Sequence, residues 1–417
     1  GSTSAPARPD GLAEAKVERI LDALHEFDVL SAPAPRLALR FALFLIASVS
    51  FCLAKAPSVR AQSFGQSNVA LRTEVYADTD RTTVYRPRVS GRSSAGPISF
   101  GASWMADVVS SASVDVLTRA TQGFDEVHQD VGFQVGWQGK RGVEGGVFYL
   151  LGIEPDYRSH GVGLQSAMDL DRNRQWRLNA TLAFSHARIE AVIDPRFRAS
   201  NYALQASVGL THILDGSNLL RIGIEAARID GLQSSPYRNV RLGNWNADRY
   251  RGDDPESLPW VFQGVTGSAR ETHPKERWRG RLGLEALHDF GVPLALLARV
   301  GAYRDSWKVS AIDLGAELRW QPLSWLLLRS GVRSYVQSRA FFWRARYVDR
   351  TDVQGYVSDD KELGRLLSHT LYGAAAFSRG AFRWDLRLEG IRYDYLDFTL
   401  LPHKYALIAQ AGMAWIL

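Results

Sequence analysis

The sequence predicts an all-β fold, a single transmembrane up-and-down antiparallel β-barrel of about 16 strands, with 14 or 18 strands as alternatives. Three observations support it. Apolar and polar residues alternate with a period of two from about residue 62 onward. The connections between the alternating segments are long and short in turn, as expected for long extracellular loops and short periplasmic turns. The last segment combines a wholly apolar face with a mixed face.

Composition is compatible with this fold and excludes several functions. The 417 residues are 46% hydrophobic, like a soluble protein, but a membrane barrel gives such values because only alternate residues face lipid. The 12 Trp and 15 Tyr suit aromatic girdles at two membrane interfaces. The formal net charge is +6 without a basic tract, so we expect no nucleic-acid partner. The single cysteine, Cys52, precedes the predicted mature chain, which excludes cysteine-based metal, redox and nucleophilic sites there.

The N-terminal region predicts export. Residues 1–35 form an extension that is left out of the fold prediction. Residues 36–61 read as a signal peptide, with Arg36 and Arg40 before an apolar run and the small residues Val59 and Ala61 at a cleavage site. An uncleaved anchor is the alternative, but the run is shorter than the roughly 20 residues of a spanning helix. We expect residues 62–417 to form the barrel.

The alternation is clearest in a few segments. Residues 100–108 place Phe100, Trp104 and Val108 on one face and serine, glycine and aspartate on the other. In a soluble sandwich the same apolar face would be the core, so the period alone does not separate the two folds. The predicted strands are 68–77, 81–90, 98–109, 127–138, 143–153, 158–169, 175–187, 199–213, 218–228, 275–288, 293–304, 309–320, 324–338, 365–378, 381–392 and 404–417.

Loop lengths separate the barrel from the sandwich. The connections 110–126, 188–198, 229–274 and 339–364 are long, and all belong to the same alternate set. The other set is short, and several of its members carry turn residues such as Gly-Lys-Arg-Gly or Asp-Gly-Ser-Asn. A Greek-key sandwich gives no reason for this alternation, whereas a barrel requires it. An even strand number also places both ends of the barrel on the periplasmic side.

The last strand resembles the C-terminal assembly signal of bacterial outer-membrane barrels. Its pattern is a polar residue, a glycine and two apolar residues, namely Gln410, Gly412, Trp415 and Leu417. An ordinary buried edge strand is the alternative. The resemblance implies insertion by the barrel-assembly machinery and a location in the cell outer membrane of a Gram-negative bacterium.

Charged residues occupy the face opposite the apolar one. A charge facing lipid costs about 2–4 kcal/mol near the midplane, so these side chains must line the lumen. Water in an open channel could solvate them, or arginines and carboxylates could pair in a partly occluded lumen. The expected lumen residues are Arg72, Glu74, Arg86, Arg88, Asp107, Asp130, Glu144, Asp169, Arg177, Arg221, Glu225, Arg277, Arg279, Arg281, Glu285, Arg299, Asp313, Glu317, Arg319, Arg329, Arg333, Arg383, Asp385, Arg387 and Glu389.

Two further features leave alternatives open. The ladder Arg277, Arg279 and Arg281 either steers anions or neutralises acidic residues on neighbouring strands. Loop 229–274 contains Trp245 and Trp260 among polar residues, which favours a plug or a lid. The acidic pairs Asp78/Asp80, Asp253/Asp254 and Asp359/Asp360 are either solvated loop charges or oxygen ligands for a divalent cation, and we assign no metal site.

The sequence does not indicate an enzyme. His160, His186 and His403 lie near strand ends, and none has a Ser, Asp or second His at a catalytic or metal-binding spacing. No phosphate loop or dinucleotide fingerprint is present, so we expect no cofactor. An outer-membrane hydrolase is therefore the least favoured function.

Several stretches resemble an uncharacterised outer-membrane family, the domain of unknown function 3570 family. They begin at Asp107 (DVVSSASVD, with TRAT at 118–121), Asp156 (DYRSH), Pro236 (PYRNVR) and Tyr335 (YVQSRA). The resemblance spans roughly 62–417 and implies an outer-membrane location without an activity. It also suggests envelope redox partners, although no residue here matches a flavin or haem site.

The sequence therefore favours a porin-like or gated channel for small polar or anionic solutes. The alternative is a non-conducting barrel that serves as a scaffold for an envelope partner, such as a redox lipoprotein of the periplasm. Outer-membrane lipid and lipopolysaccharide are expected partners in either case.

Overall fold

The computed structural model describes residues 67–111, 124–139, 142–192, 194–249 and 257–417. The predicted extension and signal peptide, residues 1–61, lie outside the described residues. So do the acidic pair Asp253/Asp254 and much of loop 110–126. Within the described ranges, no helix has the length and apolar composition needed to cross a membrane.

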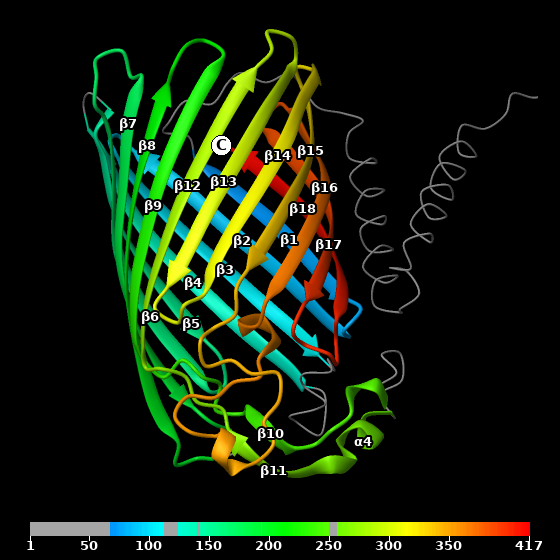
Figure 1. Cartoon of the computed structure of the whole chain (residues 1–417). Helices are drawn as coiled ribbons and strands as arrows, with labels where there is room; N and C mark the ends of the chain where they lie inside the picture. Colours follow the sequence, from blue (N-terminus) through cyan, green and yellow to red (C-terminus); the bar gives the residue numbers. More distant parts are fainter. Residues whose placement is uncertain (1–66, 112–123, 140–141, 193, 250–256) are drawn as a thin grey trace, which may run out of the picture.

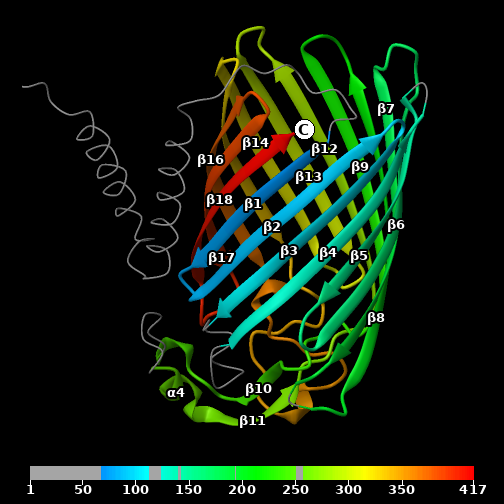
Figure 2. The same ribbon diagram turned by 180° about the vertical axis from the view of Figure 1, so that it is seen from behind.

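Sixteen strands close into one barrel in which each strand pairs antiparallel with its neighbours (Figures 1 and 2). The prediction of about 16 strands is confirmed. The strands are β1 (Asn68–Asp78), β2 (Thr82–Ala95), β3 (Ile98–Ser111), β4 (Phe124–Gln138), β5 (Glu144–Ile153), β6 (Tyr157–Asp169), β7 (Trp176–Glu190), β8 (Arg198–Ile213), β9 (Asn218–Gly231), β12 (Glu276–Asp289), β13 (Leu294–Asp305), β14 (Ser310–Leu323), β15 (Leu326–Gln337), β16 (Leu366–Arg379), β17 (Phe382–Tyr395) and β18 (His403–Ile416).

The barrel closes between its first and last strands. β1 pairs with β18 along its whole length, from Asn68 opposite Ile416 to Asp78 opposite Ala406. This seam leaves no strand edge unpaired in the barrel, which is the condition for a sheet to stand in hydrocarbon. Gln410 and Gly412 of the expected assembly signal face the lumen, and Trp415 faces outward and is half exposed.

The two ends of the barrel differ as predicted. Tight turns join β12 to β13 and β16 to β17 at the end where the C-terminus lies, and Gly291 and Gly380 have positive φ there (Figure 1). Glycine adopts this conformation without steric cost. The long connections gather at the opposite end (Figures 1 and 2). We call the two ends the short-turn end and the long-loop end.

The outward face is apolar and carries aromatic residues near both ends. Leu314 on β14, Leu371 on β16 and Phe133 on β4 are more than half exposed. At the short-turn end Trp176 stacks on His212 and Phe382 stacks on Trp415, with ring centroids 3.7 and 6.1 Å apart. This arrangement matches an apolar band between two aromatic girdles.

The long loops fold into a second, smaller structure that the sequence did not predict in detail. Between β9 and β12 they form the hairpin β10 (Asn239–Gly243) and β11 (Val265–Arg270), the 3-10 turns η2 (Ala247–Arg249) and η4 (Phe262–Gly264), and α4 (Leu258–Val261). The loop between β15 and β16 adds η5 (Arg350–Asp352) and η6 (Lys361–Leu363). We call the described residues within 232–275 and 338–365 together the cap.

The outward face yields a stability prediction. Leu314→Arg places a charge in the apolar band and is expected to lower the free energy of unfolding by about 2–4 kcal/mol, measured by urea titration in lipid vesicles. Ser207→Arg, whose side chain enters a lumen cavity, should cost clearly less. Equal losses for the two variants would contradict the assigned faces.

Candidate functional site: the lumen and its cap

The inward face has two unlike sides. The inward residues of β12 to β17, together with those of β1 and β2, carry most of the charges, and we call this the charged wall. In the middle of strands β4 to β8, the inward-facing residues are uncharged and many have small side chains. We call this part of the inward face the neutral wall. It contains Gly132, Gln134, Phe148, Leu150, Gly161, Gly163, Gln165, Thr181, Ala183, Ser185, Gln205 and Ser207. The sequence analysis predicted inward charges on many strands and did not predict this division.

On the charged wall, arginines and carboxylates alternate across strands. Arg221 on the adjacent strand β9 reaches Glu285 at 3.3 Å, and Glu285 also lies 3.9 Å from Arg299. Arg299 continues to Glu317 at 3.7 Å. Similar pairs are Arg281 and Arg333 with Asp313, Arg387 with Glu389, Arg72 with Asp385 and Arg86 with Asp107 and Glu74. The structure therefore supports pairing for much of the predicted set.

Glu317 is the most enclosed of these carboxylates. Its side chain is 3% exposed, Arg319 donates to it at 2.6 Å, and the Tyr372 hydroxyl donates at 2.5 Å. The guanidinium of Arg387 stacks on the Tyr372 ring at 3.7 Å. Tyr372 lies on the otherwise uncharged inward face of β16, and the sequence reasoning missed it because its partners come from other strands.

Some predicted lumen residues have no charged partner. Among the described residues, no ion pair involves Arg88, Arg279, Arg329 or Arg383, and Nε of both Arg279 and Arg329 is buried without a hydrogen-bond acceptor. In the predicted basic ladder, Arg277 pairs with Asp305 at 2.5 Å and Arg281 with Asp313 at 3.6 Å. The ladder thus combines both alternatives, with paired outer members and an unpaired middle one.

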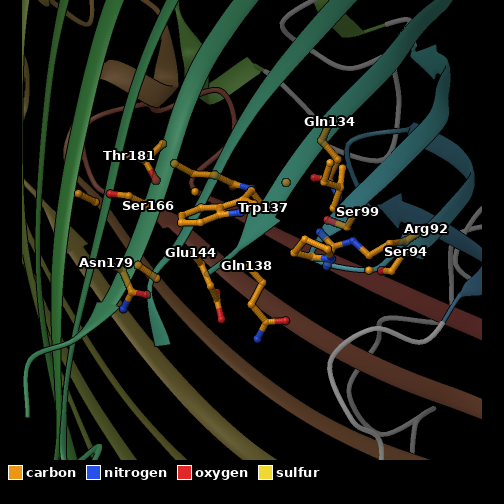
Figure 3. A pocket seen from close by; sticks show the side chains of 18 of the residues that line it. Arg92, Ser94, Ser99, Gln134, Trp137, Gln138, Glu144, Ser166, Asn179 and Thr181 are labelled. Carbon is orange, nitrogen blue, oxygen red and sulfur yellow. The ribbon is translucent and has the colours of Figure 1, made fainter. Parts of the chain in front are cut away.

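Cavities line the lumen at three levels. At the short-turn end, a cavity of about 610 Å³ lies between Arg92, Gln134, Glu144 and Asn179 (Figure 3). Arg177 borders it and binds Glu144 at 2.8 Å and Asp169 at 2.9 Å. A second cavity, of about 600 Å³, lies along the neutral wall and is bordered by Glu225, Arg279, Arg281, Phe148 and Gln205. A third, of about 420 Å³, is bordered by Arg281, Arg299, Arg333, Arg387 and Tyr372.

The cap has cores of its own. Trp245 and Val261 pack with Leu366, Tyr395, Phe398 and Leu400 of the barrel rim. Val240, Leu242, Tyr347 and Val357 form a second cluster. Leu242 pairs with Tyr347 and Thr272 with Val357, so the two long loops form one unit. The prediction that loop 229–274 folds into a plug or lid therefore gains a structural basis, with loop 338–365 as a part that the sequence did not indicate.

The turn η6 anchors the cap to inward-facing side chains at the long-loop end, where the loop between β15 and β16 gathers (Figures 1 and 2). The Tyr395 hydroxyl donates to Glu362 at 2.8 Å. The Gln337 amide donates to the carbonyl oxygens of Glu362 and Gly364 at 2.8 and 2.9 Å. Lys361 lies 3.8 Å from the Asp80 carboxylate. These contacts fix η6 to side chains at this mouth of the barrel.

The acidic pairs expected in solvated loops are instead held by cations. Asp78 ends β1, is 2% exposed and lies 3.2 Å from Nζ of Lys404. Asp80 is also buried, and Asp360 receives a hydrogen bond from Arg238. The interpretation of these pairs as solvated loop charge is wrong for these three residues, because the cap and the last strand bring basic residues to them.

A buried polar trio joins the two loops of the cap. Glu271 is 1% exposed, accepts a hydrogen bond from Ser358 and lies 3.3 Å from Nε2 of His273. Burial by itself would raise the pKa of Glu271, but the adjacent His273 imidazole, the hydrogen bond from Ser358 and the charge of Arg238 outweigh burial and hold the pKa below its ordinary value. Nearby, burial raises the pKa of Tyr347 to about 12.

Among the described residues, one cluster of three carboxylates has its oxygen atoms close enough together to hold a metal ion. The ligand atoms of Glu126, Glu154 and Asp156 lie within 4.8 Å of one another at the long-loop end. His128 lies beside them, with Nδ1 2.5 Å from Glu154 and Nε2 3.0 Å from Asp130. This imidazole supplies a local partner for the carboxylates.

Two histidine contacts on the outer face bear on the hydrolase alternative. Ser334 and His369 lie 2.9 Å apart, and His403 lies 2.6 Å from Asp394. Because the hydroxyl and the carboxylate contact different imidazoles, they do not form one catalytic triad. Ser358, His273 and Glu271 are nearly inaccessible to solvent, which suits a structural role.

A family model and several solved structures resemble this chain. A family model described as "Protein of unknown function (DUF3570)" matches residues 198–375, which confirms the predicted family resemblance over this part of the chain. Two of the four resembling stretches, those beginning at Pro236 and Tyr335, lie inside the match. No curated protein matches the sequence.

The chain also matches solved structures, including the following three. A "Bacterial polysaccharide outer membrane secretin" is 11% identical, with 85% of this chain and 100% of that chain covered and a TM-score of 0.49. The "CymD monoaromatic hydrocarbon channel" is 10% identical, with 85% and 90% covered and a TM-score of 0.41. CdiB from Acinetobacter baumannii is 9% identical, with 87% and 64% covered and a TM-score of 0.48. At 9–11% identity, what these proteins bind or transport is not carried over to this chain.

Removing the central carboxylate tests the charged wall. Glu317→Gln leaves Arg319 and Arg299 without their shared partner and should lower the free energy of unfolding by about 3 kcal/mol, measured by urea titration in vesicles. Glu285→Gln is the matched control on the same wall. Its side chain is 35% exposed, so it should cost less than about 1 kcal/mol. A loss for Glu317→Gln no larger than the control's would contradict the central role.

The cap should loosen in acid. Because the pKa of Glu271 is lowered in the folded cap, its contribution to stability is present above the ordinary glutamate pKa of about 4.3 and is lost as the pH falls through the lowered value. Limited proteolysis between pH 7 and pH 3 with an acid-tolerant protease should therefore cut the cap faster only below about pH 4. In Glu271→Gln the cap should be cut faster already at pH 7, and unchanged protection in this variant would refute the role of Glu271.

Proposed function

We propose that the chain is an integral outer-membrane channel for small polar solutes, with a preference for anions and with the cap as its gate. The observation that carries this proposal is the uneven pairing of charge on the inward face. Most inward carboxylates have a cationic partner, whereas Arg88, Arg279, Arg329 and Arg383 have no ion pair among the described residues. The unneutralised charge of the wall is therefore mainly positive.

Two of these arginines border lumen cavities. Arg279 borders the cavity along the neutral wall, where Glu225 is the acidic residue beside it. Arg88 borders another cavity, of about 430 Å³, next to Ser90, Ser103 and Gln134. A cationic group beside hydroxyl and amide groups favours a hydrated anion over a cation. The apolar outward face and the closed barrel support placement in the outer membrane, with export by the predicted signal peptide.

Ion selectivity tests the proposal. The folded protein in planar bilayers under a KCl gradient should conduct, and its reversal potential should be shifted toward the equilibrium potential of chloride. The double variant Arg279→Gln/Arg329→Gln should reduce the chloride-to-potassium permeability ratio by about twofold or more, because the two changes remove unpaired positive charge from the lumen. The control Arg228→Gln alters an outer-face arginine that pairs with Asp230 at 2.9 Å, and it should leave the ratio unchanged.

Absence of conductance in every condition, including pH 3 and the Glu271→Gln cap variant, would refute the channel. The scaffold alternative would then account better for the barrel. Cation selectivity in the wild type would refute the anion preference alone.

A further inference from the structure

The strands β6 and β7 are neighbours in the barrel (Figure 2). Their outer face carries like charges directly opposite each other. Arg158 of β6 is the direct cross-strand partner of Arg188 of β7, and His160 is the partner of His186. Both arginines are exposed, and neither takes part in an ion pair among the described residues. Like charges directly opposite each other destabilise a sheet, so this arrangement favours an external anion that bridges them.

These four side chains face outward, away from the lumen. The alternate residues Ser159, Gly161 and Ser185 face inward, since a Cβ at Gly161 would contact Ser185, and Ser185 and Gly161 border the lumen cavity of the neutral wall. His160 and His186 are also held in place from the side. The Tyr149 hydroxyl lies 2.7 Å from Nδ1 of His160, and the Tyr202 ring stacks on His186 with centroids 4.6 Å apart. The site therefore includes two tyrosines of the kind found at membrane interfaces.

Along β6 and β7 the outward side chains change from basic to apolar toward the short-turn end. The next outward pair toward the short-turn end is Val162 with Phe184, and the following pair is Leu164 with Leu182. All four are exposed large apolar side chains. Successive outward residues are about 7 Å apart along a strand. Two basic pairs therefore lie directly beyond two apolar pairs, the order in which a lipid presents its headgroup and its acyl chains.

We propose that Arg158, His160, His186 and Arg188 form a binding site for the phosphorylated headgroup of lipopolysaccharide in the outer leaflet. Arginine binds phosphate oxygens in a bidentate manner, and two opposed arginines with two imidazoles offer more donors than one phosphate of a phospholipid requires. Lipid A carries two phosphates on a disaccharide with several acyl chains, which suits both the donor number and the apolar pairs below. The inference rests on the outer-membrane placement in the proposed function and on the predicted orientation with the long loops outside, and it does not depend on conduction.

Other outer-face arginines at this end are neutralised by the protein itself. Arg392 of β17 donates to Asp394 at 2.9 Å. Arg228 of β9 lies 2.9 Å from Asp230 and stacks on Trp278. These residues provide matched controls, because they have the same charge and a comparable rim position but already have a carboxylate partner.

Titration of the detergent-solubilised folded protein with bis-phosphorylated lipid A, followed by native mass spectrometry, tests the site. Arg158→Gln/Arg188→Gln should weaken binding at least tenfold, and Arg158→Lys/Arg188→Lys should retain most of it. Arg392→Gln should change the affinity by less than twofold. Heat-modifiable electrophoretic mobility verifies that each variant is folded, and the conductance of the glutamine double variant should equal that of the wild type.

The alternative ligands are tested in parallel. Phosphatidylglycerol and inorganic phosphate should bind the wild type at least tenfold more weakly than lipid A. Equal binding of phosphatidylglycerol would overturn the assignment to lipopolysaccharide, and equal binding of inorganic phosphate would overturn the assignment to a lipid. Unchanged lipid A affinity in the glutamine double variant would overturn the site itself. A loss of conductance with normal lipid binding would count against the channel and leave this site intact.

Discussion

Satisfying every backbone hydrogen bond in a medium without water is the constraint on which the structure depends. The pairing of β1 with β18 meets it, because this seam turns a sheet with two edges into a closed cylinder. Closure fixes the direction of every side chain at once. With a period of two, one residue in each pair faces lipid and the next faces the lumen. The apolar band, the aromatic girdles and the polar interior all follow from this single geometric condition.

The lumen shows a second consequence of closure. Arginines and carboxylates are costly next to the acyl chains near the membrane midplane, so at that depth they accumulate inside, where they neutralise one another across strands around Glu317 and Asp313. Pairing is incomplete, and the arginines without an ion pair make the unneutralised charge of the charged wall mainly positive. The neutral wall differs in composition, because it is uncharged and has Phe148 and Gln205 beside glycines. The lumen therefore combines a charged and an uncharged surface, and the cap lies at one of its ends.

Much of the barrel could be predicted because its signals are local. Alternation located each of the 16 barrel strands to within a few residues, and loop lengths gave the topology. The cap could not be predicted, because β10 and β11 are short and their core depends on Tyr347 and Val357, about 100 residues away. The partners in the ion pairs could not be predicted from the sequence either. Asp305 lies just beyond the predicted strand 293–304, and the sequence does not indicate that it is the partner of Arg277. Asp78 was predicted to lie in a loop, and its partner Lys404 is more than 300 residues away in the sequence.

The central claim is that alternate residues contact lipid tails and lumen water. Spin labels placed one at a time from Ala311 to Trp320 on β14, in the vesicle-embedded protein, measure it most directly through their accessibility to oxygen and to a water-soluble nickel complex. The account predicts that the two accessibilities alternate in opposite phase, with oxygen favoured at Ile312, Leu314 and Leu318 and nickel at Asp313, Gly315 and Glu317. Uniform accessibility along the strand, or exclusion of both probes at Leu314, would contradict it.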